Sequence, residues 1–147
     1  MGIFTLADAE TLLAEVFAPW VQALGLRPVT LGTGAAKFLL PGNPELALRT
    51  GDIEADNSGV ICGQAIAAAA DTAVVLALSG ANGRFRKCTT VDLSLNYLRP
   101  LPVADTDVAV EIVSNGRKLA VARVVLSTAG TAKPAALGTA TFLYLED

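Results

Sequence analysis

The sequence contains no histidine, the side chain that most often moves protons in catalysis near neutral pH. Its absence excludes Ser-His-Asp and Cys-His catalytic sites, and it excludes metals held by histidine. We therefore expect no metal site. Any acid–base chemistry must instead come from Asp, Glu, Lys, Tyr or Cys side chains.

Charge and cysteine are scarce as well. Charged residues make up 17% of the chain, against about 25% in an average protein, and the net charge is −3. No basic field is available to bind nucleic acid or an anionic membrane. The hydrophobic share of 52% excludes a disordered chain and favours burial of some surface in an oligomer. Because Cys62 and Cys88 form no CxxC motif, we predict a reducing, cytoplasmic environment.

Only residues 59–81 form an apolar run that approaches membrane-spanning length. Gln64 and Asp71 interrupt this run, and a central aspartate costs about 2.5–3.5 kcal/mol on insertion. We therefore predict a buried helix rather than a membrane span. The N-terminus lacks the positive region of a signal peptide, and 147 residues are predicted to form one domain, 1–147.

Hydrophobic periodicity and turn residues divide the chain into helices and strands. Thr5 and Asp8 resemble a capping box before a helix over 6–17, which Pro19 is expected to loosen. Asn115-Gly116 is a strong type I′ hairpin signal. A second helix is expected over 62–79, a polar loop over 42–58, and strands over 28–31, 35–40, 90–97, 106–113, 118–127 and 134–144.

This order predicts an α+β domain in which an antiparallel sheet wraps around one long central helix, with a short helix at the N-terminus. Within the strand over 90–97, simple alternation places Val91 and Tyr97 on one face and Thr90 on the other.

The start of the predicted central helix carries a recognisable motif. The stretch Asp56-Asn57-Ser58-Gly59-Val60-Ile61-Cys62-Gly63-Gln64-Ala65-Ile66, followed by Asp71, resembles hotdog-fold acyl-CoA thioesterases, most closely the phenylacetate-degradation (PaaI-like) type. Their pattern is Asn-x-x-Gly-x-x-His-Gly-Gly, with an acid nine positions after the histidine. Further likenesses, in the family's order, are Ala18-Pro19-Trp20 with Leu24-Gly25-Leu26, Thr90-Val91-Asp92 with Asn96-Tyr97-Leu98-Arg99-Pro100, and Asn115-Gly116-Arg117.

The resemblance implies a hotdog fold, thioester hydrolysis and roles for individual residues. It makes Asp71 the nucleophile or general base, and it makes Thr90 a residue that positions the attacking water. The sequence departs from the pattern where Cys62 replaces the histidine, Gln64 the second glycine and Asp56 the asparagine. In the family the histidine and asparagine help to hold the thioester, so the resemblance makes Cys62 and Asp56 candidate residues at these two positions of the site.

Physical arguments support two of these roles. The first glycine of the pair is kept as Gly63, at a helix N-terminus whose unpaired N–H groups suit an oxyanion. Asp71 lies among alanines, so desolvation is expected to raise its pKa toward the range of a base. Eight helical residues span about 12 Å, so one site needs Gly63 and Asp71 from different subunits. The two-fold homodimer of the family provides this, and a homotetramer is implied as well.

By resemblance, Tyr97 and the segment 114–119 border a channel for coenzyme A. The candidate binding residues in the segment are Ser114, Asn115, Gly116, Arg117 and Lys118. Cationic side chains and turn amides suit phosphate and pantetheine groups. An alternative phosphate patch is Arg84, Arg86 and Lys87. Coenzyme A enters as part of the substrate, so no further cofactor is expected.

Each candidate also has a plainer interpretation. Asp71 can be a structural acid, and Thr90 simply suits a strand. Asp56 can be a helix-flanking acid or a ligand contact. Cys62 suits a small buried filler better than a nucleophile, because no histidine or neighbouring cation activates its thiol.

The alternative function is a non-catalytic protein of the same fold that binds acyl-CoA or another acyl ligand, which the missing motif histidine favours. A hotdog hydratase is disfavoured, because that branch relies on an Asp/His pair. Retention of Asp71 favours hydrolysis, since a pure binding protein has little reason to bury a lone carboxylate.

Overall fold

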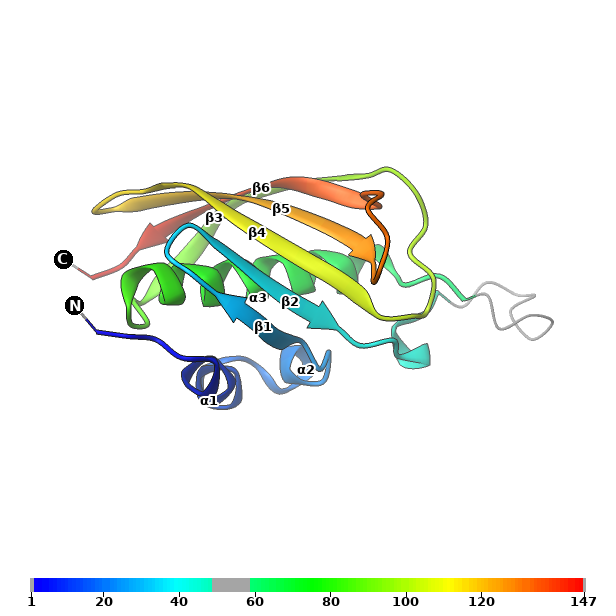
Figure 1. The fold of residues 1–147 in the computed structure, drawn as a ribbon, viewed down its shortest axis with the longest axis horizontal. Coiled ribbons are helices and arrows are strands. Elements are labelled where there is room, and N and C mark those ends of the chain that lie inside the picture. Colours follow the sequence, from blue (N-terminus) through cyan, green and yellow to red (C-terminus); the bar gives the residue numbers. More distant parts are fainter. Residues whose placement is uncertain (1, 49–58, 147) are drawn as a thin grey trace.

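A computed structural model describes residues 2–48 and 59–146 of the chain. Its centre is the helix α3 (Gly63–Asn82), around which an antiparallel sheet wraps (Figure 1). The strands lie in the order β1-β2-β4-β5-β6-β3, which matches the predicted α+β hotdog fold. Their bounds are β1 (Arg27–Leu31), β2 (Ala35–Leu40), β3 (Cys88–Tyr97), β4 (Thr106–Asn115), β5 (Leu119–Thr128) and β6 (Ala136–Tyr144).

The central helix is buried because its sequence is apolar on nearly every side. Ala69, Ala70 and Ala73 are fully buried, and their small side chains let α3 lie close to the strands. By length and composition α3 could cross a membrane, but most of it is buried inside the fold, as predicted. The helix extends three residues past the predicted end at Ser79, whose hydroxyl donates to the Val75 carbonyl. Its C-cap is Gly83, which has a left-handed backbone (φ 72°).

Local signals shape the N-terminal part, which consists of α1 (Leu6–Val16), α2 (Pro19–Gln22) and, after β2, the 3-10 turn η1 (Pro44–Leu46). The predicted capping box is present: the Asp8 N–H donates to the Thr5 hydroxyl at 3.1 Å, and the Thr5 N–H donates to the Asp8 carboxylate at 2.8 Å. The prediction for Pro19 was wrong. This proline begins a separate helix, where its missing N–H leaves no hydrogen bond broken.

The hairpin between β4 and β5 is present, but its turn differs from the prediction. Neither Asn115 nor Gly116 has the positive φ that a type I′ turn requires. A bulge late in β4 adds one residue to that strand. The reversal therefore falls on Arg117 and Lys118, and the Gly116 N–H donates to the Leu119 carbonyl at 2.8 Å.

A second bulge, in β3, decides which side chains face the helix. The pairing of β3 with β6 shifts between Thr90 and Asp92. Thr90 is paired with Phe142, and Tyr97 is paired with Ala136; both partners are buried against the core. Paired residues project to the same face of a sheet. Thr90 and Tyr97 therefore share the helix side, and the alternation predicted from sequence, which separated them, was wrong.

Candidate active site

Asp71 and Thr90 form a hydrogen-bonded pair between α3 and the beginning of β3. The Thr90 hydroxyl donates to Asp71 Oδ1 at 2.7 Å. Asp71 is half-buried, whereas Thr90 is exposed. The Thr90 oxygen retains lone pairs that can accept a hydrogen bond from water. The structure thus joins the two residues that the sequence suggested as base and water-positioning group.

The surroundings of Asp71 make its carboxylate a stronger proton acceptor than an exposed aspartate. Burial raises the pKa of Asp71 above its ordinary value, and the hydrogen bond from Thr90 acts in the opposite direction. Cys88 lies nearby: burial raises the pKa of its thiol, the charge of Asp71 raises it further, and Arg86 lowers it. The thiol of half-buried Cys88 is thus influenced by both the Asp71 carboxylate and the Arg86 guanidinium group.

Gly63 begins α3, and Tyr97 at the end of β3 contacts it. The Tyr97 hydroxyl donates to the Gly63 carbonyl at 2.9 Å. The N–H of a first helical residue has no partner within the helix, so the Gly63 N–H and the positive end of the helix dipole can act on a ligand. A Cβ at Gly63 would meet the Tyr97 ring at 3.7 Å, an ordinary contact. Alanine therefore fits at this position and keeps the N–H.

Cys62 occupies the position of the motif histidine and is the N-cap residue of α3. Its side chain makes no capping hydrogen bond, and its own N–H donates to the Leu46 carbonyl at 2.8 Å. Burial raises the pKa of Tyr97, and the neighbouring Cys62 raises it further.

The Asp71–Thr90 pair and the Gly63–Tyr97 pair lie apart within one chain. Gly63 and Asp71 are separated by eight residues of one helix, about 12 Å. Their contacts, Tyr97 and Thr90, stand at opposite ends of β3, which is an edge strand of the sheet. One chain therefore cannot place the Gly63 N–H and the Asp71 carboxylate on the same thioester carbon.

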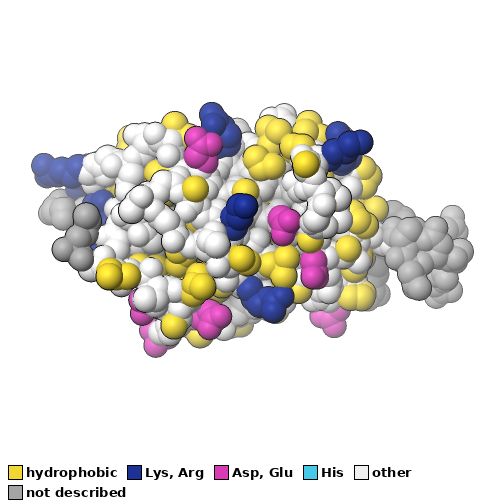
Figure 2. Space-filling model, viewed as in Figure 1, with side chains coloured by type: hydrophobic (Ala, Val, Ile, Leu, Met, Phe, Trp, Pro, Cys, Tyr) yellow, Lys and Arg dark blue, Asp and Glu magenta, His cyan; other side chains and the backbone are white. Residues whose placement is uncertain are grey.

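The two predicted phosphate patches form one cluster. Arg86 Nη2 donates to the Arg117 carbonyl at 3.0 Å, which joins the segment after α3 to the β4–β5 turn. Glu146 pairs with Arg84 at 2.6 Å and with Arg86 at 3.0 Å. Figure 2 shows Lys and Arg side chains at the left end of the molecule, where Figure 1 places this turn and the C-terminus. We call this cluster the cationic end: Arg84, Arg86, Lys87, Arg117 and Lys118.

The structure separates Tyr97 from the other candidates for coenzyme A binding. Tyr97 contacts the start of α3, whereas Asn115 Nδ2 donates to Asn82 Oδ1 at the end of the helix (2.9 Å). The 20 residues of α3 span about 30 Å. Ser114 is exposed beside the β4 bulge, and Asp56 lies outside the described residues. Within one chain, Tyr97 and the segment 114–119 therefore do not border one channel.

An apolar cavity of about 420 Å³ opens beside Gly63 and Tyr97. Ile66, Leu98 and Leu101 supply much of its apolar lining. The cavity is thus continuous with the helix start that carries the candidate oxyanion donor.

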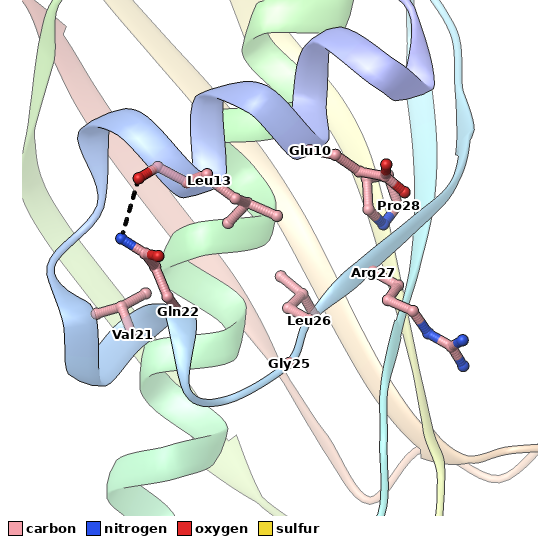
Figure 3. Close-up of a pocket in the computed structure, with 9 residues that line it drawn as sticks. Glu10, Leu13, Val21, Gln22, Gly25, Leu26, Arg27 and Pro28 are labelled. Carbon is pink, nitrogen blue, oxygen red and sulfur yellow. Dashed lines mark hydrogen bonds between the residues drawn. The ribbon is translucent and has the colours of Figure 1, made fainter.

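A second cavity, of about 300 Å³, lies between α1, α2 and the start of β1 (Figure 3). The Gln22 amide at its edge is already bonded, donating to the Ala14 and Phe17 carbonyls at 3.2 and 2.8 Å. None of the candidate catalytic residues lines this second cavity. Among residues 2–48 and 59–146, no three His, Cys, Asp or Glu side chains lie close enough together to hold a metal ion.

The acyl-CoA thioesterase N-terminal domain family matches residues 46–143, about two thirds of the chain. The chain belongs to the acyl-CoA thioesterase family. The matched residues include α3 and β3, which carry Gly63, Asp71, Thr90 and Tyr97. The protein is therefore a thioester hydrolase by family.

Solved structures share the fold of this thioesterase. A conserved protein from Pseudomonas aeruginosa is 26% identical, with a TM-score of 0.75 over 90% of this chain and 98% of that one. A thioesterase from Haemophilus influenzae is 20% identical, with a TM-score of 0.80 over 97% and 92% of the two chains. Thioesterase superfamily member 2 from zebrafish is 19% identical, with a TM-score of 0.78 over 95% and 98%. No curated protein matches the thioesterase by sequence.

Sequence reasoning missed three residues that organise the cationic end: Asn82, Tyr144 and Glu146. Asn82 Nδ2 donates to the Tyr144 hydroxyl at 2.9 Å, and Glu146 pairs with the two arginines named above. A tyrosine that closes a buried strand needs a partner for its hydroxyl, and this was the available signal for Tyr144. Nothing in the local sequence marks Glu146, because its partners lie about 60 residues away.

Proposed function

We propose that the chain hydrolyses acyl-CoA thioesters at an active site shared by two subunits of a homodimer. Asp71 acts as nucleophile or general base, and the Gly63 N–H is the oxyanion donor. The observation that carries the proposal is the placement of the Asp71–Thr90 and Gly63–Tyr97 pairs at opposite ends of one edge strand, on the same face. An edge strand that pairs with its own copy brings its two ends together.

The register of such a dimer follows from β3 itself. Antiparallel pairing centred on Ser94, with the extra residue of the bulge left unpaired, sets Tyr97 opposite Thr90 of the partner subunit. Opposite residues share a face, so Gly63 then lies near Asp71 of the partner subunit. The outer edge of β3 offers ten residues for this pairing, and the exposed fractions of Val91 (57%) and Tyr97 (51%) fit a surface that a second copy covers.

The chemistry needs no group beyond these residues and water. As a general base, Asp71 takes a proton from water, and the water oxygen attacks the thioester carbonyl carbon. The C–S bond then breaks, and the departing thiolate takes up a proton, which yields a free acid and coenzyme A. As a nucleophile, Asp71 attacks the carbon itself and expels the thiolate, and water then hydrolyses the acyl-enzyme anhydride. Thr90 orients the carboxylate in both cases.

The carbonyl oxygen gains negative charge during either attack. The Gly63 N–H and the positive end of α3 stabilise that charge. An oxyanion donor of this kind is worth roughly 10²–10³-fold in kcat in other enzymes. Because the donor is a backbone group, the replacement of the family histidine by Cys62 leaves it in place.

The cationic end is the binding site for the phosphate groups of coenzyme A. Arginine binds phosphate through paired, charge-assisted hydrogen bonds. Four residues of extended chain, about 13 Å, separate Arg86 from Thr90, a distance that the pantetheine arm can bridge. Coenzyme A therefore lies along the subunit that supplies Asp71. The phenylacetate-degradation type, a homotetramer built from two dimers, a cytoplasmic location and the absence of a further cofactor belong to the same proposal.

A second candidate function is acyl-CoA binding without hydrolysis, because Cys62 and Gln64 replace two residues of the family motif. A thiol-release assay of the purified chain over short, long and aryl acyl-CoAs distinguishes hydrolysis from binding alone. We expect release of coenzyme A from at least one member of the panel. Tight binding of an acyl-CoA by calorimetry without any thiol release would contradict hydrolysis and support the binding protein.

A further inference from the structure

Tyr144 closes a ring of three hydrogen bonds at the cationic end. Asn82 Nδ2 donates to the Tyr144 hydroxyl at 2.9 Å, and that hydroxyl donates to Asn115 Oδ1 at 2.6 Å. Asn115 Nδ2 donates to Asn82 Oδ1 at 2.9 Å, which completes the ring. The three side chains come from the ends of α3, β4 and β6. The ring therefore ties the helix end to the turn that carries Arg117, and its bonds reinforce one another.

The aromatic face of Tyr144 supports a guanidinium group. The Arg86 guanidinium lies 3.6 Å from the centroid of the Tyr144 ring, within the range of a cation–π contact. Glu146 and the Arg117 carbonyl bind other nitrogens of the same group. The Arg86 side chain is 14% exposed, whereas that of Arg84 is 60% exposed. Arg86 is thus held in one orientation, with its contacts supplied by two segments, the end of β6 with the residues after it and the β4–β5 turn.

We propose that Tyr144 is a positioning residue for the phosphate groups of the substrate. Its ring orients Arg86, and its hydroxyl fixes the turn that carries Arg117 and Lys118. The two cationic segments then act on one ligand. This inference rests on the proposed function, since the ligand it names is the nucleotide part of coenzyme A.

A role in packing alone does not account for the hydrogen bonds and the guanidinium contact of Tyr144. Phenylalanine would fill the same buried space at the end of β6, yet Tyr144 has two hydrogen-bond partners and a guanidinium on its face. Burial raises the pKa of Tyr144, so its hydroxyl remains protonated and able to donate to Asn115. The hydrogen bonds of the buried Tyr144 side chain and its guanidinium contact run to the cationic end.

The experiment compares each variant on an acyl-CoA and on the same acyl group carried by pantetheine, which lacks the nucleotide phosphates. We expect Tyr144→Phe, which keeps the ring and loses the hydroxyl, to raise KM for acyl-CoA roughly threefold. Tyr144→Leu, which loses both, is expected to raise it roughly tenfold or more. kcat and the KM for acyl-pantetheine are expected to stay within about twofold of the wild type. Equal rises on both substrates, or no rise on either, would overturn the inference.

Two further variants separate positioning from stability. Phe38→Leu removes a buried ring from β2, away from the cationic end, and is expected to lower the melting temperature without changing the ratio of the two KM values. If Tyr144→Leu does not fold, Asn115→Ala opens the same ring of hydrogen bonds from an exposed strand end, and the same threefold rise is expected.

Calorimetry with coenzyme A itself distinguishes failure of this inference from failure of the proposed function. A wild type that binds coenzyme A but hydrolyses nothing would contradict catalysis alone, and weaker binding by the Tyr144 variants would still support positioning. Unchanged coenzyme A affinity in those variants, or no binding by the wild type, would overturn the inference.

Discussion

The two ends of α3 present different chemistry to a substrate. At its start, Gly63 and the Tyr97 hydroxyl are neutral groups beside an apolar cavity, and the helix dipole supplies the positive potential. At its end, Arg84 and Arg86 bring full positive charges, held by Glu146. Asp71, the proposed base or nucleophile, lies between these ends. One chain thus spreads the proposed oxyanion, base and phosphate contacts over about 30 Å, and the proposed antiparallel copy would bring the first two together.

The largest effect is expected at the carboxylate between the two ends. Asp71→Asn keeps an oxygen that can accept from Thr90, so the fold is expected to persist while kcat falls roughly 10²-fold or more. Asp92→Asn, on the exposed strand surface, is the matched control and is expected to be near wild type. Steady-state kinetics and circular dichroism measure both. Near-normal turnover by folded Asp71→Asn would refute its role.

The cationic end is tested by removing the charges of the β4–β5 turn. Replacing Arg117 and Lys118 by Ala is expected to raise KM for acyl-CoA roughly tenfold and to spare acyl-pantetheine, because only phosphate contacts are lost. Arg123→Ala, which removes an exposed cation paired with Glu111 elsewhere on the sheet, is the control for loss of a cation outside the cationic end. Equal effects on both substrates would place the phosphate groups elsewhere.

Thr90 is expected to affect pH dependence as well as rate. Thr90→Val removes the hydrogen bond that opposes the effect of burial on Asp71, so the pKa of Asp71 rises further. A base acts only when ionised, so the acidic limb of the kcat/KM profile is expected to move to higher pH, with a roughly tenfold loss of kcat. Thr90→Ser keeps the hydroxyl and is expected to restore the profile. An acidic limb that does not move in Thr90→Val would argue against the coupling.

The smallest effect is expected at the start of α3, where Cys62 replaces the family histidine. Cys62→Ala is expected to change kcat less than about threefold, because the thiol makes no capping bond and the proposed oxyanion donor is the Gly63 N–H. Thiol-release kinetics measured with an assay insensitive to protein thiols decide this. A hundredfold loss would assign Cys62 a direct part in the chemistry.

Much of the fold could be predicted because its signals are local. The capping box of Thr5 and Asp8, the apolar surface of α3 and the turn residues between strands each depend on a few adjacent residues. The bulges in β3 and β4 could not be predicted, since each adds one residue to a strand without a turn signature. The bulge in β3 matters most, because it places Thr90 and Tyr97 on one face.

In the candidate site too, residues marked by local signals could be predicted and contacts between distant segments could not. Gly63 and Asp71 follow from the start of one helix, and Thr90 follows from a motif on one strand. The single cationic end could not be predicted, because Arg86 and Arg117 come from segments 31 residues apart. Their proximity depends on how the β4–β5 turn meets the end of α3, which no local pattern encodes.

The shared active site is tested most directly by mixing two inactive variants, Asp71→Asn and Gly63→Pro, the second of which deletes the proposed oxyanion N–H. Gly63→Ala, which keeps that N–H and fits beside Tyr97, is the control for the substitution itself and is expected to stay active. Circular dichroism checks that both inactive variants fold, and mass measurement checks that subunits exchange.

In a mixed dimer one of the two sites contains both substitutions and the other site contains neither. Random reassortment makes about half of the dimers mixed, each with one intact site of two, so about a quarter of wild-type activity is expected to return. Verified mixed dimers that remain as inactive as their parents would contradict a site built from Gly63 of one subunit and Asp71 of the other.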